Sequence, residues 1–362
     1  MIKLIVIILI ILVIMFFNRK GIPIFLYHQV NNLSNITPDL FEKHLQILKK
    51  KNINTLTISE YYRNNNNKNS ALITLDDGYI DNYLYVFPLL KKYNMKATIF
   101  LNTFYIKEKH SGKSIEIETN GVANNEAIKK FLSSGNAGSE QYLSWEQIKE
   151  MSQSGLVDFQ AHSHKHMAIF KNDNLEDIFL EDEGDCTDTF LYKHIKKGFP
   201  KFPKRGEYSG KGIIIKPEFF DLFEDYYQKK LVGKNKKDLL KLGNKFIKKH
   251  KKNYFIYETT FEANERIKKD FITNKNLIEQ HLNKPVLFFC WPWGHRDKES
   301  ISLLKNLGIK GFITTKKGTN SYYPNWDMIR RIELRKFTPF KFKINLFINR
   351  NLFLGKLYGW LS

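Results

Sequence analysis

Two adjacent carboxylates end one of the apolar stretches of this sequence. Asp76 and Asp77 follow the run Ala71–Leu75 and precede Gly78. Neighbouring buried acids destabilise a fold unless a cation or hydrogen-bond donors stabilise their charge. Gly78 lets the chain turn sharply, so both carboxylates could face one cavity although successive strand residues point to opposite faces. Asp-Asp-Gly alone is more typical of a capped turn, so a charged site here needs partners from elsewhere.

Three histidines follow another apolar run and are the best candidates for these partners. His162, His164 and His166 come after the segment LVDFQA. If the chain curls helically after the strand, His162 and His166 share a face at spacing i,i+4, whereas an extended chain places all three on one face. We favour the curl because no glycine interrupts Ala161–Ser163.

One carboxylate and two imidazoles form a ligand set for a divalent metal that keeps positions open for water. We therefore expect Asp77, His162 and His166 to bind such an ion, with Zn²⁺ as the first expectation. The cation would stabilise the charge of Asp77. Asp76 would then remain ionised as the base for a metal-bound water.

Aromatic residues follow two further apolar runs. Trp291 and Trp293 lie in the segment CWPWG and combine a large apolar ring with a polar N–H, which suits a sugar or an acetyl group. Both tryptophans fit a role in the core equally well. Tyr27 and His28, at the tip of the first predicted strand, would line the same site, with structural packing as the alternative.

Eight apolar segments with helical stretches between them predict the elements that position these residues. Near-continuous apolar strands indicate a sheet covered on both faces. We expect an α/β fold with a distorted (β/α) barrel of about seven strands, and an open doubly wound sheet is the alternative. In a barrel, the carboxyl ends of the strands form one rim where distant residues meet. The predicted strands are 22–28, 53–58, 71–77, 96–101, 156–162, 285–291, 309–315 and 328–334.

A long segment interrupts this pattern between the histidines and the tryptophans. Residues 257–282 resemble a long helix of the barrel. Residues 171–252 then form a large, basic, helical insertion, because they far exceed an ordinary connection between a strand and a helix. The core contacts that we expect from the long helix are Phe261, Ile267, Phe271, Leu277 and Leu282.

The first residues predict a membrane anchor. Ile2–Phe17 is apolar except for Lys3, and basic residues follow it. Its helical length of about 24 Å is slightly short of the ~30 Å hydrocarbon core, but flanking basic side chains can snorkel. No small-residue cleavage pattern follows, so we expect residues 1–20 to be an uncleaved single-pass anchor. Basic residues on both sides leave the orientation open, and we expect an extracytoplasmic domain.

Residues 21–345 would then form the barrel with its insertion, and residues 346–362 an amphipathic C-terminal segment. This last segment mixes apolar and basic residues. It predicts a helix that either docks on the domain, as terminal helices usually do, or lies on a bilayer surface.

The composition narrows the possible partners. The chain has 362 residues and a formal net charge of +21, so its surface attracts polyanions. Part of this excess reflects lysine-rich composition throughout the sequence. We expect no nucleic-acid partner, since no finger spacing, RNP-like strand or basic zipper is present. Cys186 and Cys290 lie far apart and predict no disulfide framework.

Four stretches resemble the polysaccharide deacetylase family, also called the NodB homology or carbohydrate esterase family 4 group. The resemblance covers most of residues 22–170 and 257–340. It depends most on Asp-Asp-Gly with its downstream strand and on His-Ser-x-x-His. The matching stretches are PIFLYHQV, ITLDDGYIDNYLYVFPLLKKYNMKATIFL, HSHKH and FFCWPWG.

The resemblance implies hydrolysis of an N-acetyl group on a surface or exported polysaccharide. It also implies Asp76 as catalytic base, Asp77, His162 and His166 as metal ligands, and Trp291, Pro292, Trp293 and Gly294 as part of the substrate groove. The metal would polarise the acetyl carbonyl while Asp76 takes a proton from water.

Two positions depart from the family pattern. Cys290 stands where many members have an arginine that orients the base, and Arg330 or Arg331 could replace that charge. No histidine occurs after His295, although members often have a late histidine as general acid. We therefore expect His295 to act as the acid.

Two other functions fit the same residues. A glycan-binding or assembly protein could keep the barrel after losing catalysis, which the two departures favour. An O-acetyl esterase would use the same metal and base. Survival of all three predicted ligands argues for chemistry.

Overall fold

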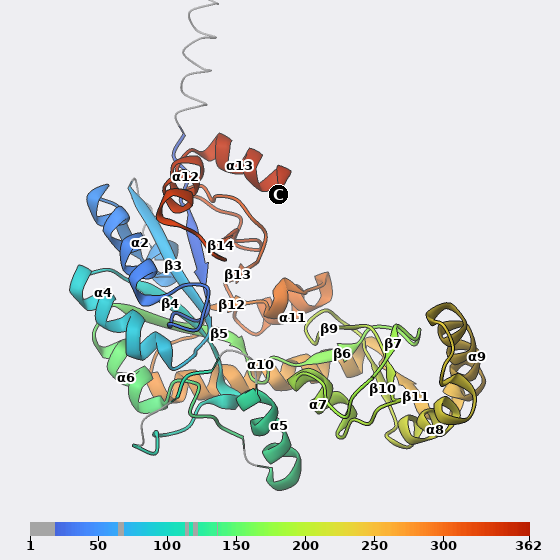
Figure 1. Cartoon of the computed structure of the whole chain (residues 1–362). Helices are drawn as coiled ribbons and strands as arrows, with labels where there is room; N and C mark the ends of the chain where they lie inside the picture. The colour runs from blue at the N-terminus through green and yellow to red at the C-terminus, as the bar shows by residue number, and fades with distance from the viewer. Residues whose placement is uncertain (1–18, 64–68, 113–115, 119–121, 136) are drawn as a thin grey trace, which may run out of the picture.

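The computed structural model describes residues 19–63, 69–112, 116–118, 122–135 and 137–362 (Figure 1). Its main body is an α/β fold around a parallel sheet in which seven strands follow the order β13–β12–β5–β4–β3–β1–β14, and β2 pairs with β3. All eight predicted strands are confirmed. They are β1 (Ile24–Tyr27), β2 (Asn54–Leu56), β3 (Ser70–Asp77), β4 (Ala97–Asn102), β5 (Val157–Ser163), β12 (Phe288–Cys290), β13 (Gly311–Ile313) and β14 (Ile332–Glu333).

The sheet curves into a half-barrel whose two edges meet at one place. Ile313, the last residue of β13, forms a parallel bridge with Ile329, three residues before β14. Ile329 donates its amide to Phe312 and accepts one from Thr314, at 2.9 and 3.0 Å. Residues 329–333 therefore connect β13 to β14, which pairs with β1.

Side chains alternate between two apolar clusters along the strands, as the pleat requires. One cluster lies under the outer helices α2 (Pro38–Lys50), α4 (Phe87–Tyr93), α6 (Trp145–Gln153), α10 (Thr260–Leu282) and α11 (Lys298–Asn306). It takes Phe25, Ile73 and Phe289. The other takes their neighbours Ile24, Leu72 and Phe288, together with two residues of α3 (Ile58–Arg63). This alternation decides which residues at the strand ends can reach a site on the concave face.

The insertion forms a second unit with its own apolar cluster, on the right of Figure 1. Its helices are α7 (Cys186–Tyr192), α8 (Glu218–Tyr226) and α9 (Lys236–Tyr254). We predicted a helical insertion and no strands in it. The helices are present, but the unit also contains an antiparallel sheet of order β11–β10–β6–β9. Two of these strands lie just outside residues 171–252. The strands are β6 (Ala168–Phe170), β9 (Lys204–Gly206), β10 (Ile213–Ile215) and β11 (Phe255–Tyr257).

Helix α10 corrects the predicted long helix at its start. Residues 255–257 belong to β11, and α10 begins at Thr260 after a capping box between Thr259 and Glu262. Phe261 is 73% exposed and therefore makes no core contact. Ile267 and Phe271 are fully buried, as predicted.

The C-terminal residues form two helices, α12 (Pro339–Asn349) and α13 (Leu352–Leu361). The predicted boundary between residues 345 and 346 is wrong, because it falls inside α12. Within the described part of the chain, none of the helices combines the length and the apolarity needed to cross a bilayer. The predicted anchor segment, Ile2–Phe17, lies outside the described residues.

A sharp turn follows β3 and directs both acids to the same side. Asp77 has a φ of 76° and Gly78 a φ of 78°, so two consecutive residues adopt the left-handed region. Asp76 points to the concave face because it lies four residues after Leu72 in β3 and therefore on the same face of the strand. Asp77 would point to the opposite face in a continuing strand, and the turn brings it back. The predicted turn is thus confirmed, and it begins at Asp77 itself.

We expect Gly78→Ala to destabilise the domain more than Gly155→Ala. Both glycines have φ above 70°, so each alanine pays a similar backbone cost of about 1 kcal/mol. A Cβ at Gly78 would lie 2.7 Å from Leu101 Cδ2, whereas one at Gly155 meets nothing within 4 Å. Overpacking should add about 1–3 kcal/mol at Gly78 only. Urea denaturation of the two variants measures the difference, and equal losses would contradict this account.

Candidate active site

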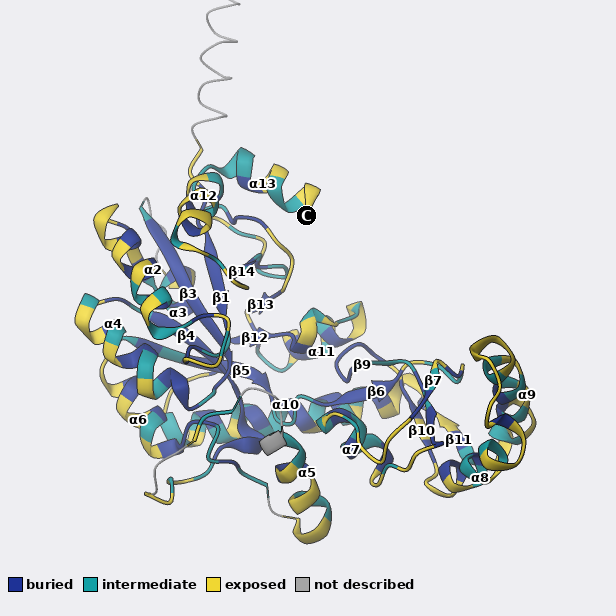
Figure 2. Cartoon of the chain, in the orientation of Figure 1, coloured by how far each residue is buried: buried dark blue, intermediate teal, exposed yellow. Residues whose placement is uncertain are grey.

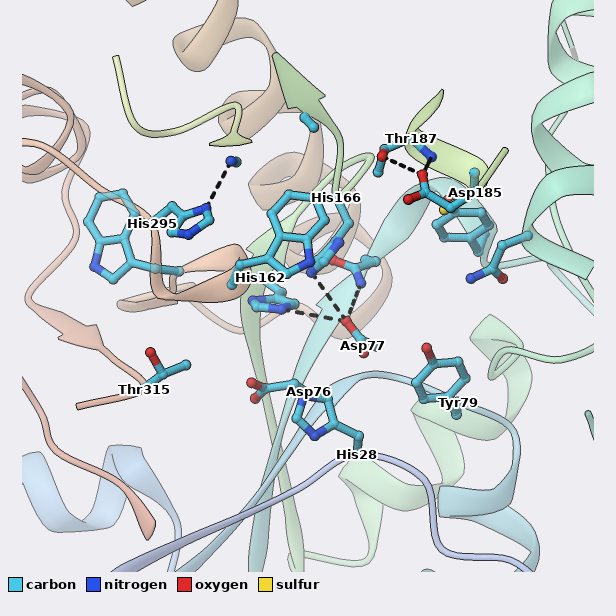
Figure 3. A pocket seen from close by; sticks show the side chains of 18 of the residues that line it. His28, Asp76, Asp77, Tyr79, His162, His166, Asp185, Thr187, His295 and Thr315 are labelled. Carbon is cyan, nitrogen blue, oxygen red and sulfur yellow. Dashed lines mark hydrogen bonds and ion pairs between the residues drawn. The ribbon is translucent and has the colours of Figure 1, made fainter. Parts of the chain in front are cut away.

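A cavity of about 790 Å³ lies at the carboxyl ends of the parallel strands (Figure 3). The ends of all seven strands in the sheet order contribute to it, as does the insertion. The side chains that the strands supply are His28, Asp76, Asn102, His162, Trp291, Thr315 and Glu333. The predicted convergence of distant segments at one rim is therefore present.

Asp77, His162 and His166 meet in this cavity (Figure 3). Asp77 Oδ1 lies 3.5 Å from His162 Nε2 and 3.7 Å from His166 Nε2. Their ligand atoms all lie within 4.8 Å of one another. Asn102 donates a 2.8 Å hydrogen bond to Asp77 Oδ1 and holds the carboxylate in place.

Both histidines are prepared to act as neutral ligands. The Nδ1 atom of His162 lies 2.7 Å from the backbone carbonyl of Cys290, which can only accept, so Nδ1 donates and Nε2 keeps its lone pair toward Asp77. Burial lowers the pKa of His162 and of His166 to about 4. Both rings are therefore uncharged near neutral pH.

The chain reaches His166 through a turn, so the predicted helical curl is wrong. β5 continues through Ser163, and His166 then adopts a φ of 56°. Its amide donates to Ser163 Oγ at 2.8 Å. His164 points away and lies 2.9 Å from Thr103 Oγ1. The prediction that His162 and His166 share a site while His164 does not is nevertheless correct.

Asp270, on helix α10, holds the loop of residues 164–166 that follows β5. Its carboxylate accepts the amides of His164 and Lys165 at 2.8 and 3.2 Å, and the hydroxyl of Tyr208 at 2.6 Å. The short bonds to a buried carboxylate restrain the loop strongly. Nothing in the sequence pattern marked Asp270 for this role, because a single acid in a charged helix is usually solvated.

Asp76 is paired with a buried arginine. Arg331 binds it through two hydrogen bonds of 2.7 and 2.8 Å, and Arg331 is only 1% exposed. Burial alone would raise the pKa of the Asp76 carboxyl, but the Arg331 guanidinium holds it well below its usual range. Asp76 is therefore ionised. Of the two arginines that we considered from sequence, the structure selects Arg331, because Arg330 bonds the carbonyl of Lys317 instead.

The Cys290 thiol lies beside this pair, and the charge next to Asp76 comes from Arg331. Its sulfur lies 3.1 Å from Arg331 Nη2 and 3.5 Å from Asp76 Oδ2. Burial raises the pKa of the thiol well above its usual value, so it stays protonated. Asp76, His162 and Cys290 also come within 4.8 Å of one another.

Two overlapping sets could thus bind a metal, and their chemistry separates them. In the set with Cys290, the thiol is protonated and the Asp76 carboxylate is already occupied by Arg331. In the set of Asp77, His162 and His166, two neutral imidazoles and a carboxylate present free lone pairs. This second set fits a divalent ion such as zinc. It is the set that we predicted.

Tyr27 is not part of the cavity. It is 2% exposed, and its hydroxyl lies 3.0 Å from His44 Nδ1. Tyr27 lies on the same face of the sheet as Phe25 and therefore points toward the outer helices. His28, the next residue, points to the opposite face. Our placement of Tyr27 at the rim is wrong, and that of His28 is confirmed by its position in the cavity wall.

His28 lies beside Asp76 (Figure 3). The turn that follows it is held by Asp81, whose carboxylate accepts the amide of Val30 at 3.0 Å and the side chain of Asn31 at 2.7 Å. Asn82 donates to the carbonyl of His28 at 3.1 Å. These bonds tie the end of β1 to the turn after β3, which carries both site acids.

The tryptophan motif divides between core and cavity. Trp291 is fully buried, stacks on Phe312 and belongs to the cluster under the helices, although one edge reaches the cavity. Trp293 is 42% exposed and its ring lies 4.2 Å from that of His166. Of the two tryptophans, Trp293 is therefore the one whose ring is accessible from the cavity. Pro292 lies between the two tryptophans, and Gly294, with a φ of 72°, ends the turn after Trp293.

His295 lines the cavity at a distance from the acids (Figure 3). Its Nδ1 accepts the amide of Gly206 at 3.0 Å, so Nε2 carries the proton of the neutral ring. Burial lowers its pKa, and Arg205 and Lys171 lower it further. His295 is thus fixed by the insertion strand β9.

The insertion supplies one wall of the cavity. Asp185 caps helix α7 by accepting the amide of Thr187, and Lys204 binds Asp185 and Asp188. Arg205 lies beside them. Tyr79, Tyr105 and Tyr142 form an aromatic wall nearby. Sequence reasoning missed both groups. The charged residues lie in the insertion, where no motif is recognisable, and Tyr79 follows Asp-Asp-Gly directly, but its type alone does not separate a cavity residue from a core residue.

A family comparison decides the relationship. The polysaccharide deacetylase family model matches residues 63–202, which contain Asp76, Asp77, His162 and His166. This segment belongs to the polysaccharide deacetylase family. Members of the family are hydrolases that act on carbon–nitrogen bonds other than peptide bonds.

Two curated relatives resemble this chain over part of its length. YxkH of Bacillus subtilis (strain 168), which carries a polysaccharide deacetylase name, is 32% identical over 155 residues, or 41% of this chain and 44% of its own. The poly-beta-1,6-N-acetyl-D-glucosamine N-deacetylase of Staphylococcus epidermidis (strain RP62A) is 28% identical over 182 residues, or 48% and 52%. The chain thus spans about half the length of the curated relatives it matches.

A solved structure has a similar fold. The deacetylase domain of BpsB from Bordetella bronchiseptica aligns with a TM-score of 0.54 over 87% of this chain and 96% of that one. Sequence identity is 18%, so this likeness concerns the fold alone.

We expect Arg331→Met to destabilise the half-barrel domain by about 3–5 kcal/mol, because it leaves the buried Asp76 carboxylate without a partner. Arg330→Met is the matched control, since Arg330 makes only a carbonyl contact near the surface and should cost under about 1 kcal/mol. Arg331→Lys keeps the charge but loses the two-pronged geometry and should fall between them. Chemical denaturation measures all three, and equal effects of the two methionine variants would contradict the role given to Arg331.

Proposed function

We propose that this chain is a metal-dependent deacetylase that hydrolyses N-acetyl groups of an N-acetylated polysaccharide. The observation that carries the proposal is the pairing of an ionised, arginine-bound Asp76 with the adjacent ligand set of Asp77, His162 and His166 in one cavity. The two acids come from the end of β3 and the two histidines from β5 and the loop after it. Both segments lie within residues 63–202, which match the family model.

Asp77, His162 and His166 would hold the metal. When bound, a divalent ion supplies a Lewis acid that polarises the acetyl carbonyl and lowers the pKa of water. Zinc is the first candidate because the set combines neutral imidazoles with one carboxylate.

Asp76 receives the proton of the attacking water in this proposal. Two bonds from Arg331 orient its carboxylate and keep it ionised. They also weaken it as a base, so Arg331 serves alignment at the expense of proton affinity. Alignment is valuable because a misplaced base loses most of its effect.

The departing amine needs a proton, and His28 is better placed to deliver it than His295. His28 lies beside Asp76, and its charge contributes to the low pKa of that carboxyl. It also acts electrostatically on His166. His295, our choice from sequence, contacts Gly206 and the ring of Trp293. We therefore assign the acid role to His28.

The substrate wall supports a sugar polymer. Trp293 offers a half-exposed ring next to His166, and the cavity volume lies within the ~300–1,000 Å³ typical of small-molecule sites. The Staphylococcus relative acts, by its name, on poly-beta-1,6-N-acetyl-D-glucosamine. We take this polymer as the first substrate to test.

Two other functions remain as rivals. An O-acetyl esterase would use the same base and ligands, and only the substrate separates it. A binding protein without catalysis is less well supported, because the tautomer of His162 and the orientation of Asp76 are both maintained by specific bonds.

Acetate release from poly-β-1,6-N-acetylglucosamine oligomers tests the proposal. We expect activity that is lost on chelation and restored by a divalent metal. Asp76→Asn and His162→Ala should each lower kcat by about 10²–10⁴-fold, whereas Leu180→Ser, on the exposed surface of the insertion, should not. His162→Ala should also lose bound metal, whereas Asp76→Asn should keep it. Equal acetate release by all variants, or release from O-acetylated glycan only, would contradict N-deacetylation.

We expect His28→Gln to lower kcat by about 10²–10⁴-fold, as the loss of a general acid does. His295→Gln should change kcat little and KM modestly. Parallel steady-state kinetics with metal content as a control separate the two residues. The opposite ranking would return the acid role to His295.

A further inference from the structure

The two C-terminal helices carry exposed residues (Figure 2), and several of these residues are large and apolar. On α12, Phe342 and Leu346 are buried against the domain. Three other apolar residues of α12, at spacing i, i+4, i+7, are exposed, and so are three apolar residues of α13, at spacing i, i+3, i+4. The exposed fractions are 70% for Phe340, 41% for Ile344, 72% for Phe347, 40% for Leu357, 80% for Trp360 and 70% for Leu361. We call these six residues the terminal apolar surface.

Helix α13 is held so that its apolar side faces outward. Gly355 and Gly359, one turn apart, form the side that packs on the domain. A Cβ at Gly355 would lie 2.4 Å from Thr319 Cγ2, and one at Gly359 would lie 2.4 Å from the carbonyl of Lys317. Only glycine allows so close an approach, so the exposed position of Trp360 is a consequence of packing rather than of a detached helix.

Basic residues surround the terminal apolar surface. The segment from Arg335 to Ser362 contains no acidic residue. Lys341, Lys343 and Lys356 are exposed, and none of them forms an ion pair with a described residue. Exposed aromatic and aliphatic residues flanked by lysine are typical of helices that lie on an anionic bilayer.

The terminal apolar surface lies next to Arg19 and Lys20, the first described residues after the apolar N-terminal segment. Lys20 forms a bridge with Asn351, and Leu352 donates its amide to the carbonyl of Arg19 at 2.8 Å. These contacts place the residues that follow Ile2–Phe17 at the junction of α12 and α13 (Figure 1). A bilayer that contained the N-terminal segment would therefore begin within a few residues of α13.

We propose that the terminal apolar surface rests on the headgroup region of an anionic phospholipid bilayer. Its aromatic and leucine side chains enter the interface, and the lysines contact lipid phosphates. With the N-terminal segment this makes two attachments, and a rigid two-point contact sets the orientation of the domain.

The orientation follows from the direction of the strands. β1 begins just after residues 19–20, so α13 lies near the amino ends of the parallel strands, and the cavity lies at their carboxyl ends. The eight residues of β3 span about 26 Å at ~3.3 Å per residue. The cavity would thus open on the side away from the lipid, where a polymer rather than a lipid headgroup is within reach.

Fluorescence quenching by brominated phospholipids tests this proposal with the full chain. The protein is bound to vesicles of phosphatidylglycerol and phosphatidylethanolamine, with or without brominated acyl chains. The difference between wild type and Trp360→Phe isolates the emission of Trp360. Leu33→Trp and Leu180→Trp, each in the Trp360→Phe background, are matched controls because these positions are 66% and 70% exposed and lie at other parts of the domain.

We expect brominated lipid to quench most of the Trp360 emission and to leave the tryptophans at positions 33 and 180 unquenched. Unquenched Trp360 in protein that floats with the vesicles would overturn the proposal. If its emission were then blue-shifted in proportion to protein concentration, a second copy of the chain would be the occupant of the surface. A concentration-independent blue shift would assign the surface to the N-terminal segment instead. Acetate release should be unchanged in Trp360→Phe, so the result is independent of the proposed activity.

Discussion

A buried ion pair between Asp76 and Arg331 is the constraint on which the rest of this structure depends. Both groups leave water, and the desolvation of two charges is repaid only by near-ideal geometry. The two parallel bonds between guanidinium and carboxylate meet that condition. Because Arg331 lies in the segment that joins the two edges of the half-barrel, the same pair that orients the Asp76 carboxylate also closes the sheet around the cavity. Stability and chemistry are thus coupled through one contact.

Two backbone turns orient the side chains of Asp77 and His166 into the cavity. Asp77 and His166 both adopt left-handed angles that cost energy for residues with a Cβ. In each case a neighbouring polar group supports the turn: Asn102 holds the carboxylate of Asp77, and Ser163 accepts the amide of His166. The strained residues are the ones whose side chains must meet, which is where such strain is expected in a functional site.

The insertion changes the character of the cavity. A parallel half-barrel alone would offer the strand ends and their loops, whereas here strand β9 and the start of α7 add charged side chains to one wall. β9 also fixes His295 through the amide of Gly206. The insertion has its own apolar cluster, so its contribution to the cavity is that of a stable unit rather than of a loose loop.

The sequence by itself determined the strands of the sheet and the candidate metal ligands. Eight long apolar runs predict eight strands, because burial on both faces requires such runs, and the polar residues just past them predict the rim. The sequence could not determine which of two neighbouring residues at a strand end faces the cavity. Tyr27 and Trp291 take the phase of the helix-covered face, and this depends on the curvature and closure of the whole sheet. Nor could it choose Arg331 over Arg330, place Asp270 under the histidine loop, or recognise the short strands of the insertion. Those features arise from contacts between segments about 40 to 255 residues apart, and only the tertiary structure brings such segments together.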